Sequence, residues 1–262
     1  MFGLATFMFR PNMEDISLNI PKNSEHPSCP VQNCFFIQLY QNIYTIVPSK
    51  SLYITNSDNI IIKSDNMKLE LKIVNLLARN TEKRFTINEI AKTITEHYSF
   101  VHRIVNRLAK DKVIVKDKVG RAYACSLNTE NEKTIALTLL SEIEKTSEFY
   151  SSNKELKIIL EDFVKSIISQ TNIISIALFG SHAKGTAKKE SDIDILLISK
   201  KKAGAIDKIA KEIYAKYGKE INAITITPYD FKKQRNKAIL KEIINKHYAL
   251  YGAEEFVKLA LR

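Results

Sequence analysis

The hydrophobic pattern of residues 67–128 predicts three short helices followed by a pair of strands. Apolar residues at positions 69, 73, 76 and 77 fall on one face of the first helix. Thr86 and Glu89 then form the Ser/Thr-x-x-Glu pattern of a capping box, which predicts the start of the second helix. The two helices are separated by a short basic turn.

A third helix and a hairpin complete this segment. Val101, Ile104, Val105 and Leu108 recur at helical spacing and form the expected buried stripe of the third helix. Two alternating segments, 113–120 and 121–127, meet near Gly120 and are typical of a β-hairpin.

Residues 129–170 contain two more helical patterns. The second is the stronger, and its apolar positions are Leu156, Ile159, Leu160, Phe163, Val164, Ile167 and Ile168. We expect a helical connector between two domains. Its apolar face either packs on the sheet of its own domain or forms the seam of a homodimer, and the pattern leaves both open.

Continuous apolar runs typical of buried strands follow the connector. They are IISIALF (173–179) and DIDILLI (192–198), and EINAITIT (220–227) predicts a later strand. Thr227 and Pro228 give the next segment a helix-start signal, with Asp230 as a capping acid.

Residues 1–66 differ from the remainder. They hold five of the six prolines and are rich in Asn and Ser, with strand-like pieces at 43–47 and 59–63. This composition indicates an accessory hairpin or a poorly ordered segment. Met67 directly precedes a clean helical pattern, so a native start at this residue is a further hypothesis.

The positive charge is concentrated in the middle of the chain. The whole sequence carries a net charge of +11, and residues 67–128 hold thirteen Lys/Arg against six Asp/Glu. Such an excess favours polyanionic partners, and its concentration in one segment favours a nucleic-acid-binding module.

Three cysteines are too few and too scattered for a disulfide framework. His26, Cys29 and Cys34 lack the fourth ligand of a closed zinc site, so reduced thiols are the preferred interpretation. No apolar run approaches the roughly 20 residues of a membrane helix, and the N-terminus lacks a signal-peptide pattern. We therefore expect a cytoplasmic protein without a membrane partner.

The order of three helices and a hairpin in residues 67–128 resembles a winged helix-turn-helix domain. The resemblance implies a partner of double-stranded DNA, with polar and cationic groups of the third helix reading bases and phosphates. The candidate DNA-binding residues are Tyr98, Ser99, His102, Arg103, Asn106 and Arg107 on the helix, and Lys116, Lys118 and Arg121 at the expected hairpin tip. A protein partner for the same surface is the alternative.

Two aspartates interrupt the apolar run at 192–198. Side chains at i and i+2 of a strand share a face, so Asp192 and Asp194 are expected side by side with Ile193 in the core. Adjacent carboxylates repel each other unless a cation neutralises them, and Mg²⁺ prefers such oxygen ligands. Gly180 and Ser181 lie at the end of the preceding strand, where small residues and free amides can approach a phosphate.

The Gly180-Ser181 turn, ten-residue spacer and Asp192-Ile193-Asp194 motif resemble the polymerase β-like nucleotidyltransferase superfamily, most closely its minimal type. The resemblance covers about residues 171–252. It implies transfer of a nucleoside monophosphate from an NTP to a hydroxyl group, and ATP is the expected NTP. It further implies that Asp192 and Asp194 hold Mg²⁺, that Gly180, Ser181 and Lys184 bind the phosphates, and that the spacer is helical.

The superfamily places a third acid on a later strand, where this chain has Asn222. Glu220 lies two residues earlier on the same face and is the candidate replacement as a catalytic residue. With Asn222 in that slot, a nucleotide-sensing regulator without turnover is an alternative. A third reading is an antitoxin-type transferase that acts on a partner protein, as small members of the group do.

These patterns together predict an α+β multidomain protein. The expected divisions are an accessory segment 1–66, a winged helix-turn-helix domain 67–128, a helical connector 129–170 and a nucleotidyltransferase domain 171–262 with a mixed sheet and helices.

Overall fold

The structure is a computed structural model that describes residues 52–54, 60–62, 65–200 and 206–262. Its first strands, β1 (Leu52–Ile54) and β2 (Ile60–Ile62), pair antiparallel. The β2 strand lies within the second strand-like piece expected before residue 66. The first piece, residues 43–47, lies outside the described residues.

The next part of the chain contains three helices and a three-stranded antiparallel sheet. Its elements are α2 (Asp65–Ala78), β3 (Phe85–Thr86), α3 (Ile87–Thr93), α4 (Tyr98–Lys110), β4 (Ile114–Val119) and β5 (Ala122–Leu127). The strand order is β3-β5-β4, and Gly120 makes the β4–β5 turn with a φ of +60°. The helices and the hairpin lie where the pattern predicts them. That the module is a winged helix-turn-helix domain stays a prediction.

Local sequence signals explain where these helices begin and how they pack. The Thr86 hydroxyl accepts a hydrogen bond from the Glu89 amide, and the Glu89 carboxylate accepts one from the Thr86 amide, so the predicted capping box is present. In α4 the expected stripe of Val101, Ile104, Val105 and Leu108 is almost completely buried. The opposite faces of α4 are thereby left to solvent.

Two long helices follow, α5 (Glu132–Ser152) and α6 (Lys154–Gln170), and Asn153 ends one and begins the other. The apolar face of α6 packs on the large sheet, because Ile159, Leu160, Phe163 and Ile167 are buried with residues of β6 and β7. Of the two alternatives for this face, packing on the sheet of its own domain is the arrangement in the structure.

The large sheet is mixed and has four strands. They are β6 (Ile173–Phe179), β7 (Ile193–Ser199), β8 (Ile221–Ile226) and β9 (Tyr248–Tyr251). The order is β8-β7-β6-β9, in which β7 and β8 are parallel while β6 is antiparallel to both β7 and β9. This confirms the expected mixed sheet with helices.

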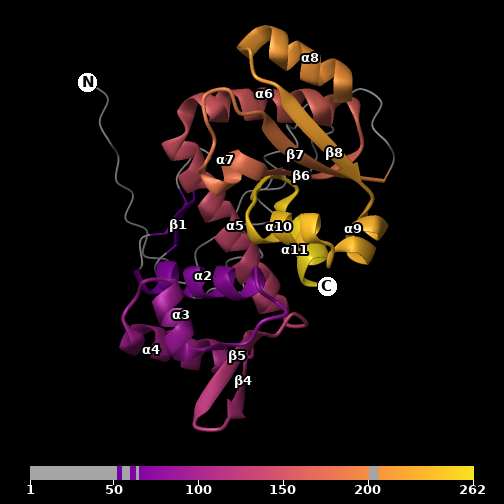
Figure 1. The fold of residues 1–262 in the computed structure, drawn as a ribbon. Coiled ribbons are helices and arrows are strands. Elements are labelled where there is room, and N and C mark those ends of the chain that lie inside the picture. The colour runs from indigo at the N-terminus through magenta and orange to yellow at the C-terminus, as the bar shows by residue number, and fades with distance from the viewer. Residues whose placement is uncertain (1–51, 55–59, 63–64, 201–205) are drawn as a thin grey trace, which may run out of the picture. The chain divides into compact units, whose positions relative to one another are not determined.

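Helices cover both faces of this sheet (Figure 1). The remaining helices are α7 (Gly180–Lys184), α8 (Ile206–Tyr217), α9 (Pro228–Gln234), α10 (Ala238–Asn245) and α11 (Ala253–Leu261). On one face α6 and α8 pack on Ile193, Ile195 and Leu197. On the other, α9, α10 and α11 pack on Leu196 and Ile198. Alternate residues of β7 therefore belong to different cores.

A buried ionic cluster connects α2, α5 and the segment that joins α10 to β9. Its centre is Glu142 of α5, whose side chain is 4% exposed. Arg79 donates from Nη2 to both carboxylate oxygens at 2.9 and 3.1 Å, and Asn75 donates to one of them at 3.0 Å. His247 Nε2 lies 3.3 Å from the carboxylate, and Lys145 donates to the His247 carbonyl oxygen at 2.9 Å. Despite its burial, the cationic neighbours hold the pKa of Glu142 well below its usual range.

Within the described residues, no helix combines the length and the apolar character that a membrane crossing requires. Cys125 is a buried free thiol whose pKa is raised by burial. The residues His26, Cys29 and Cys34, considered above as metal ligands, lie outside the described residues.

Candidate functional site

The two aspartates meet the Gly-Ser turn at one end of the large sheet. β7 begins at Ile193, which is fully buried, while Asp192 is exposed and Asp194 half-buried. Because Phe179 pairs with Asp194 across the β6–β7 ladder, Gly180 directly follows the residue opposite Asp194. The structure thus brings Asp192, Asp194 and Gly180 together, as the spacing predicts.

Gly180 is required for this close approach. A Cβ atom built on Gly180 would lie 1.9 Å from Asp194 Oδ2 and 2.7 Å from its Cγ. The φ of Gly180 is +68°, a conformation that side chains other than glycine's disfavour. The turn can therefore bend over the Asp194 carboxylate only with glycine at this position.

The segment after the turn is helical over a shorter stretch than expected. Helix α7 spans only Gly180–Lys184, and Gly185 ends it in the left-handed conformation. The rest of the spacer is irregular, with the Ser191 hydroxyl accepting a hydrogen bond from the Lys188 amide at 2.8 Å. The expectation of a helical ten-residue spacer is wrong from Gly185 onward, because Gly185 permits a left-handed stop that ends the helix.

The electrostatics of Asp194 favour a bound cation. Burial raises its pKa, and repulsion from Asp192 raises it further. His182, a hydrogen bond from the Ser181 amide and Lys184 all act in the opposite direction. A carboxylate in this position is costly to ionise, and a divalent ion bound to both acids would remove that cost.

Asn222, not an acid, stands beside the aspartates. It is level with Asp194 in the parallel β7–β8 pairing, and its Nδ2 donates to Asp192 Oδ2 at 3.2 Å. The Glu220 side chain is exposed, while its backbone carbonyl accepts a hydrogen bond from the Ile193 amide at 2.9 Å. Among the contacts of the described residues, the Glu220 side chain has none with the aspartates, so its catalytic role stays a prediction.

Asp230 is committed to its helix. Its amide donates to Thr227 Oγ1 at 3.1 Å, and the Thr227 hydroxyl donates to the Asp230 carboxylate at 2.7 Å. Pro228 occupies the first turn of α9. The predicted helix start with Asp230 as a capping acid is confirmed.

Sequence reasoning missed two residues of the site. His182, which lies next to Ser181, is close enough to Asp194 to lower its pKa, and its place after the Gly-Ser turn could have suggested it. Glu242 of α10 forms an ion pair with Lys184, so this candidate phosphate ligand already has an acidic partner. No local pattern connects Glu242 to Lys184.

The donor set fits magnesium with few protein ligands. Over the described residues, no group of three or more His, Cys, Asp and Glu side chains gathers in a way that could hold a metal ion. Asp192 and Asp194 supply two carboxylates, and the neutral Asn222 amide donates to one of them. Magnesium is commonly held by one or two carboxylates, with water and substrate phosphates as the remaining ligands, so the residues present fit this ion.

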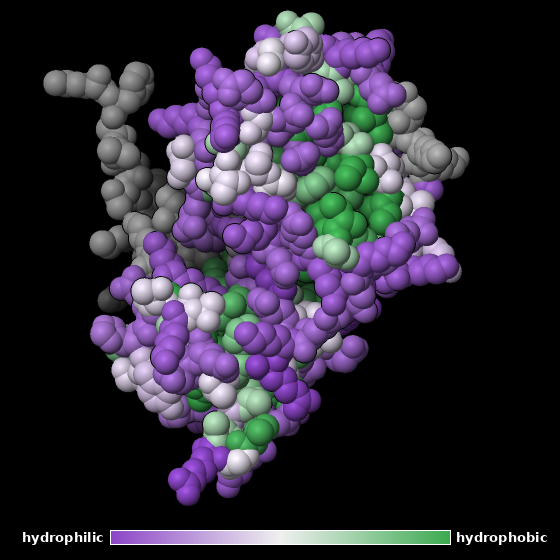
Figure 2. Space-filling model, in the orientation of Figure 1, coloured by the Kyte–Doolittle hydropathy of each residue, from purple (hydrophilic) through white to green (hydrophobic). Residues whose placement is uncertain are grey.

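An apolar surface adjoins the acids on the same face of the sheet. Ile224 follows Asn222 by two residues on β8 and is 46% exposed, although Ile226 farther along that face packs in the core. Figure 2 shows apolar side chains gathered in the part of the surface where Figure 1 draws β8. A nucleobase or an acceptor could rest on such a surface beside the charged end of the sheet.

Replacing Gly180 by alanine tests the contact between the turn and Asp194. Because the new Cβ would overlap the Asp194 carboxylate, we expect affinity for Mg-ATP to fall at least about tenfold, as supporting changes at metal sites do. Calorimetric titration measures the loss. Gly185→Ala is the control, since its Cβ would have no neighbour within 4 Å and its φ of +73° carries the same backbone strain. Equal losses in both variants would contradict the role of the contact.

The candidate DNA-binding residues on α4 fall into two groups. Tyr98 is 52% exposed and stacks on His102, and Ser99 beside it is also exposed. Arg103 is exposed and donates to Asn66 Oδ1 at 2.9 Å. Arg107 instead pairs with the buried carboxylate of Glu70, whose pKa is raised by burial against the opposing effect of Arg107. Arg107 therefore stabilises the module itself.

The hairpin residues differ in position. Lys118 and Arg121 are exposed near the β4–β5 turn, as expected. Lys116 lies in the middle of β4, opposite Cys125, where it donates to Asn106 Oδ1 at 2.6 Å and lies 4.6 Å from the centre of the Tyr123 ring. Its placement at the hairpin tip is wrong, because β4 continues three residues beyond it to Val119. Lys116 and Asn106 hold the hairpin against α4.

Comparison with known proteins identifies the sheet domain. A model of the nucleotidyltransferase domain matches residues 157–251, which begin within α6 and end at β9. Three proteins of Methanocaldococcus jannaschii, each named "Putative protein adenylyltransferase", are also similar. One is 30% identical over 114 residues, covering 40% of this chain and 78% of the relative, and a second is 32% identical over 94 residues, covering 35% and 94%.

Similarities to solved structures are weaker. They include a toxin-antitoxin crystal structure with AMP-PNP, 17% identical with a TM-score of 0.31, covering 39% of this chain and 82% of that one. They also include Lactococcus lactis ZitR in complex with DNA, 17% identical with a TM-score of 0.28, covering 54% and 92%. Both TM-scores are below 0.5, so neither similarity supports a conclusion about the function of this chain.

Proposed function

Because the chain belongs to the nucleotidyltransferase family, we propose that its sheet domain transfers an adenylyl group from ATP to a hydroxyl group of a protein. The observation that carries the proposal is the meeting of Asp192, Asp194 and the Gly180 turn, where a Cβ would overlap a carboxylate. The relatives named as protein adenylyltransferases favour a protein acceptor and ATP over other substrates of the family.

In the proposed reaction the acceptor oxygen forms a bond to the α-phosphorus of ATP. The bond from that phosphorus to the oxygen bridging the α- and β-phosphates breaks, and pyrophosphate leaves. Asp192 and Asp194 would hold Mg²⁺, which when bound supplies positive charge to the phosphate oxygens. The turn at Gly180 and Ser181 would position the terminal phosphates, and Glu220 is the proposed acceptor of the hydroxyl proton.

The test uses the full chain with Mg²⁺ and ATP labelled at the α-phosphate. We expect pyrophosphate release together with transfer of label to protein, either the chain itself or protein in an added cell extract. Intact-mass measurement identifies the modification as one AMP. Tight binding of Mg-ATP with no pyrophosphate and no labelled protein would overturn the proposal of transfer.

That last outcome defines the second candidate function, a nucleotide sensor without turnover. It is favoured by Asn222, a neutral residue that contacts Asp192 where the family has an acid. An amide cannot accept the hydroxyl proton, and it leaves the site with one negative charge fewer. The Asn222→Asp variant distinguishes the transferase from the sensor. If the variant transfers label and the unchanged protein does not, the sensor function is favoured.

We further propose that the helices and hairpin of residues 67–128 form a winged helix-turn-helix module that binds double-stranded DNA. Support comes from the exposed cationic groups of Arg103 on α4 and of Lys118 and Arg121 near the hairpin turn. Cations of this kind bind DNA phosphates without sequence preference and position the recognition helix.

Replacing both Lys118 and Arg121 by alanine should weaken binding to duplex DNA and make it less sensitive to salt. Loss of two phosphate contacts lowers the slope of log K against log salt by about two. Fluorescence anisotropy over a salt series measures this slope. Lys208→Ala on α8 is the control, since Lys208 is an exposed cation of the sheet domain. An unchanged slope in the double variant would mean that the hairpin does not contact DNA phosphates. Arg107→Ala would be a poor test, because it leaves Glu70 buried without its partner.

A further inference from the structure

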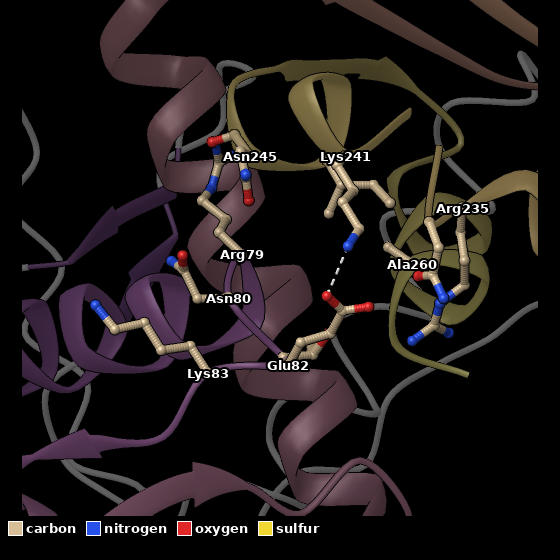
Figure 3. Close-up of a pocket in the computed structure, with 11 residues that line it drawn as sticks. Arg79, Asn80, Glu82, Lys83, Arg235, Lys241, Asn245 and Ala260 are labelled. Carbon is tan, nitrogen blue, oxygen red and sulfur yellow. Dashed lines mark hydrogen bonds and ion pairs between the residues drawn. The ribbon is translucent and has the colours of Figure 1, made fainter. Parts of the chain in front are cut away.

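A polar pocket lies between the segment after α2 and the helices α9 to α11, and its lining includes neither Asp192 nor Asp194 (Figure 3). Its volume is about 210 Å³. The first wall contains Arg79, Glu82 and Lys83, and the second contains Arg235 and Lys241. Polar amides of Asn80, Asn236 and Asn245 complete much of the lining.

The pocket has an excess of positive charge. Arg79 is neutralised by Glu142 behind it, and Lys241 is paired with Glu82 at 2.8 Å. Lys83 and Arg235 have no ion-pair partner among the described residues, although Lys83 lies over the Phe85 ring. Figure 3 shows the Lys83 side chain extending away from Lys241 and Arg235, so Arg235 supplies the uncompensated positive charge of the recess.

Hydrogen-bond donors are available as well as charge. The Lys241 ammonium donates to Glu82 and lines the pocket, so an anion that displaced Glu82 could accept this hydrogen bond. The guanidinium of Arg235 presents several donors in a planar array that suits phosphate oxygens. Lysine side chains add point charges that also bind phosphate. The lining favours an anion over a neutral ligand, and a phosphate group offers it more acceptor oxygens and more negative charge than a carboxylate.

Glu82 occupies part of this cationic environment. Its pKa is lowered mainly by the hydrogen bond from Lys241, with a smaller effect of Arg235. Figure 3 shows the Glu82 carboxylate directed toward Lys241 across the pocket. Because an incoming anion would repel this carboxylate and compete with it for Lys241, Glu82 should oppose binding.

We propose that this pocket is a binding site for a small phosphate-bearing anion, with Arg235 and Lys241 as its cationic ligands and Glu82 as an internal competitor. The anion is either free pyrophosphate or the terminal phosphates of a nucleotide, which share the same chemistry. The site is distinct from the aspartate site, and the proposal does not depend on nucleotidyl transfer.

The experiment is a calorimetric titration of the full chain carrying Asp192→Asn and Asp194→Asn, without magnesium, so that the aspartate site is disabled. Pyrophosphate and ATP are titrated separately. Binding of pyrophosphate alone identifies a free inorganic ligand, binding of ATP alone identifies a nucleotide, and equal binding identifies recognition of the phosphates. Absence of binding by both ligands at millimolar concentration would overturn the proposal.

Three variants on the same background test the assignment of residues. Arg235→Ala should weaken binding at least about fivefold, and Glu82→Gln should tighten it about threefold, as charges of opposite sign near one anion require. Lys237→Ala is the matched control. It removes a nearby exposed cation that is absent from the pocket lining and contacts Gln234. Equal affinity in Arg235→Ala and Lys237→Ala, or weaker binding in Glu82→Gln, would refute the site; thermal unfolding verifies that each variant is folded.

Discussion

Replacing Asp194 by asparagine is expected to reduce Mg-dependent release of pyrophosphate at least about 100-fold. Residues that merely support metal ligands cost about 10- to 100-fold when removed, and Asp194 is proposed as a ligand itself. It is also the acid that the Gly180 turn approaches most closely. Initial rates at saturating Mg-ATP, with label transfer as a second readout, measure the loss.

The matched control for this prediction is Glu190→Gln. Glu190 is exposed in the loop just before Asp192, so the variant removes one negative charge close to the site without removing a proposed ligand. Nearly unchanged rates are expected. Comparable losses in the two variants would mean that Asp194 acts through general electrostatics, and full activity of Asp194→Asn would exclude it as a ligand.

Replacing Glu142 by glutamine is expected to lower the free energy of unfolding by about 3–5 kcal/mol, the usual cost of breaking a buried ion pair from one side. The variant leaves the Arg79 guanidinium, which is 11% exposed, with carbonyl oxygens but no anion. Urea unfolding at neutral pH measures the change. The side chain keeps its size, so loss of packing would not explain the result.

Glu144→Gln on the same helix is the control, and it is not expected to destabilise the protein. Burial and repulsion from Glu148 raise the pKa of Glu144, and its Oε2 atom is buried without a hydrogen-bond partner in the described part of the chain. Neutralising it should leave stability unchanged or raise it slightly. Destabilisation of similar size in both variants would contradict a specific stabilising role for the ion pairs of Glu142.

The pH dependence of unfolding follows from the same two carboxyl groups. Because folding lowers the pKa of Glu142, its contribution to stability is present above the ordinary carboxyl pKa near 4.5 and is lost as the pH falls below it. Glu144→Gln should lose stability below this pH as the unchanged protein does. In Glu142→Gln the fall in stability with decreasing pH should be smaller. Urea unfolding midpoints measured between pH 3 and 7 provide the comparison. A difference of one pKa unit between folded and unfolded states corresponds to about 1.4 kcal/mol of stability.

Features set by neighbouring residues could be predicted from the sequence. The capping box of Thr86 and Glu89 spans three positions, and the relation of Asp192 to Asp194 follows from the two-residue repeat of a strand. Gly180 lies beside the aspartates because the Gly-Ser turn follows the end of β6 and the aspartates stand at the start of β7, its antiparallel neighbour. In each of these examples the geometry is fixed by local backbone conformation, which a short segment can encode.

Features set by packing between distant segments could not be predicted. The sequence around Arg107 does not indicate that Arg107 pairs with Glu70. Likewise, the sequence around Lys184 does not indicate its pairing with Glu242. The position of Lys116 depended on where the hairpin turned, and the ionic cluster around Glu142 requires three segments to meet. The charge of these residues is visible in the sequence, but their partners are fixed only by the tertiary structure.

Adjacent residues of α10 face the two proposed phosphate sites. Lys241 pairs with Glu82 at the pocket, and Glu242 pairs with Lys184 at the end of the Gly-Ser turn. Both pairs are anchored to one helix of eight residues. If an anion in the pocket displaced this helix, it would alter how Lys184 meets ATP, and thermodynamic reciprocity would then require ATP to alter affinity for the anion by the same factor.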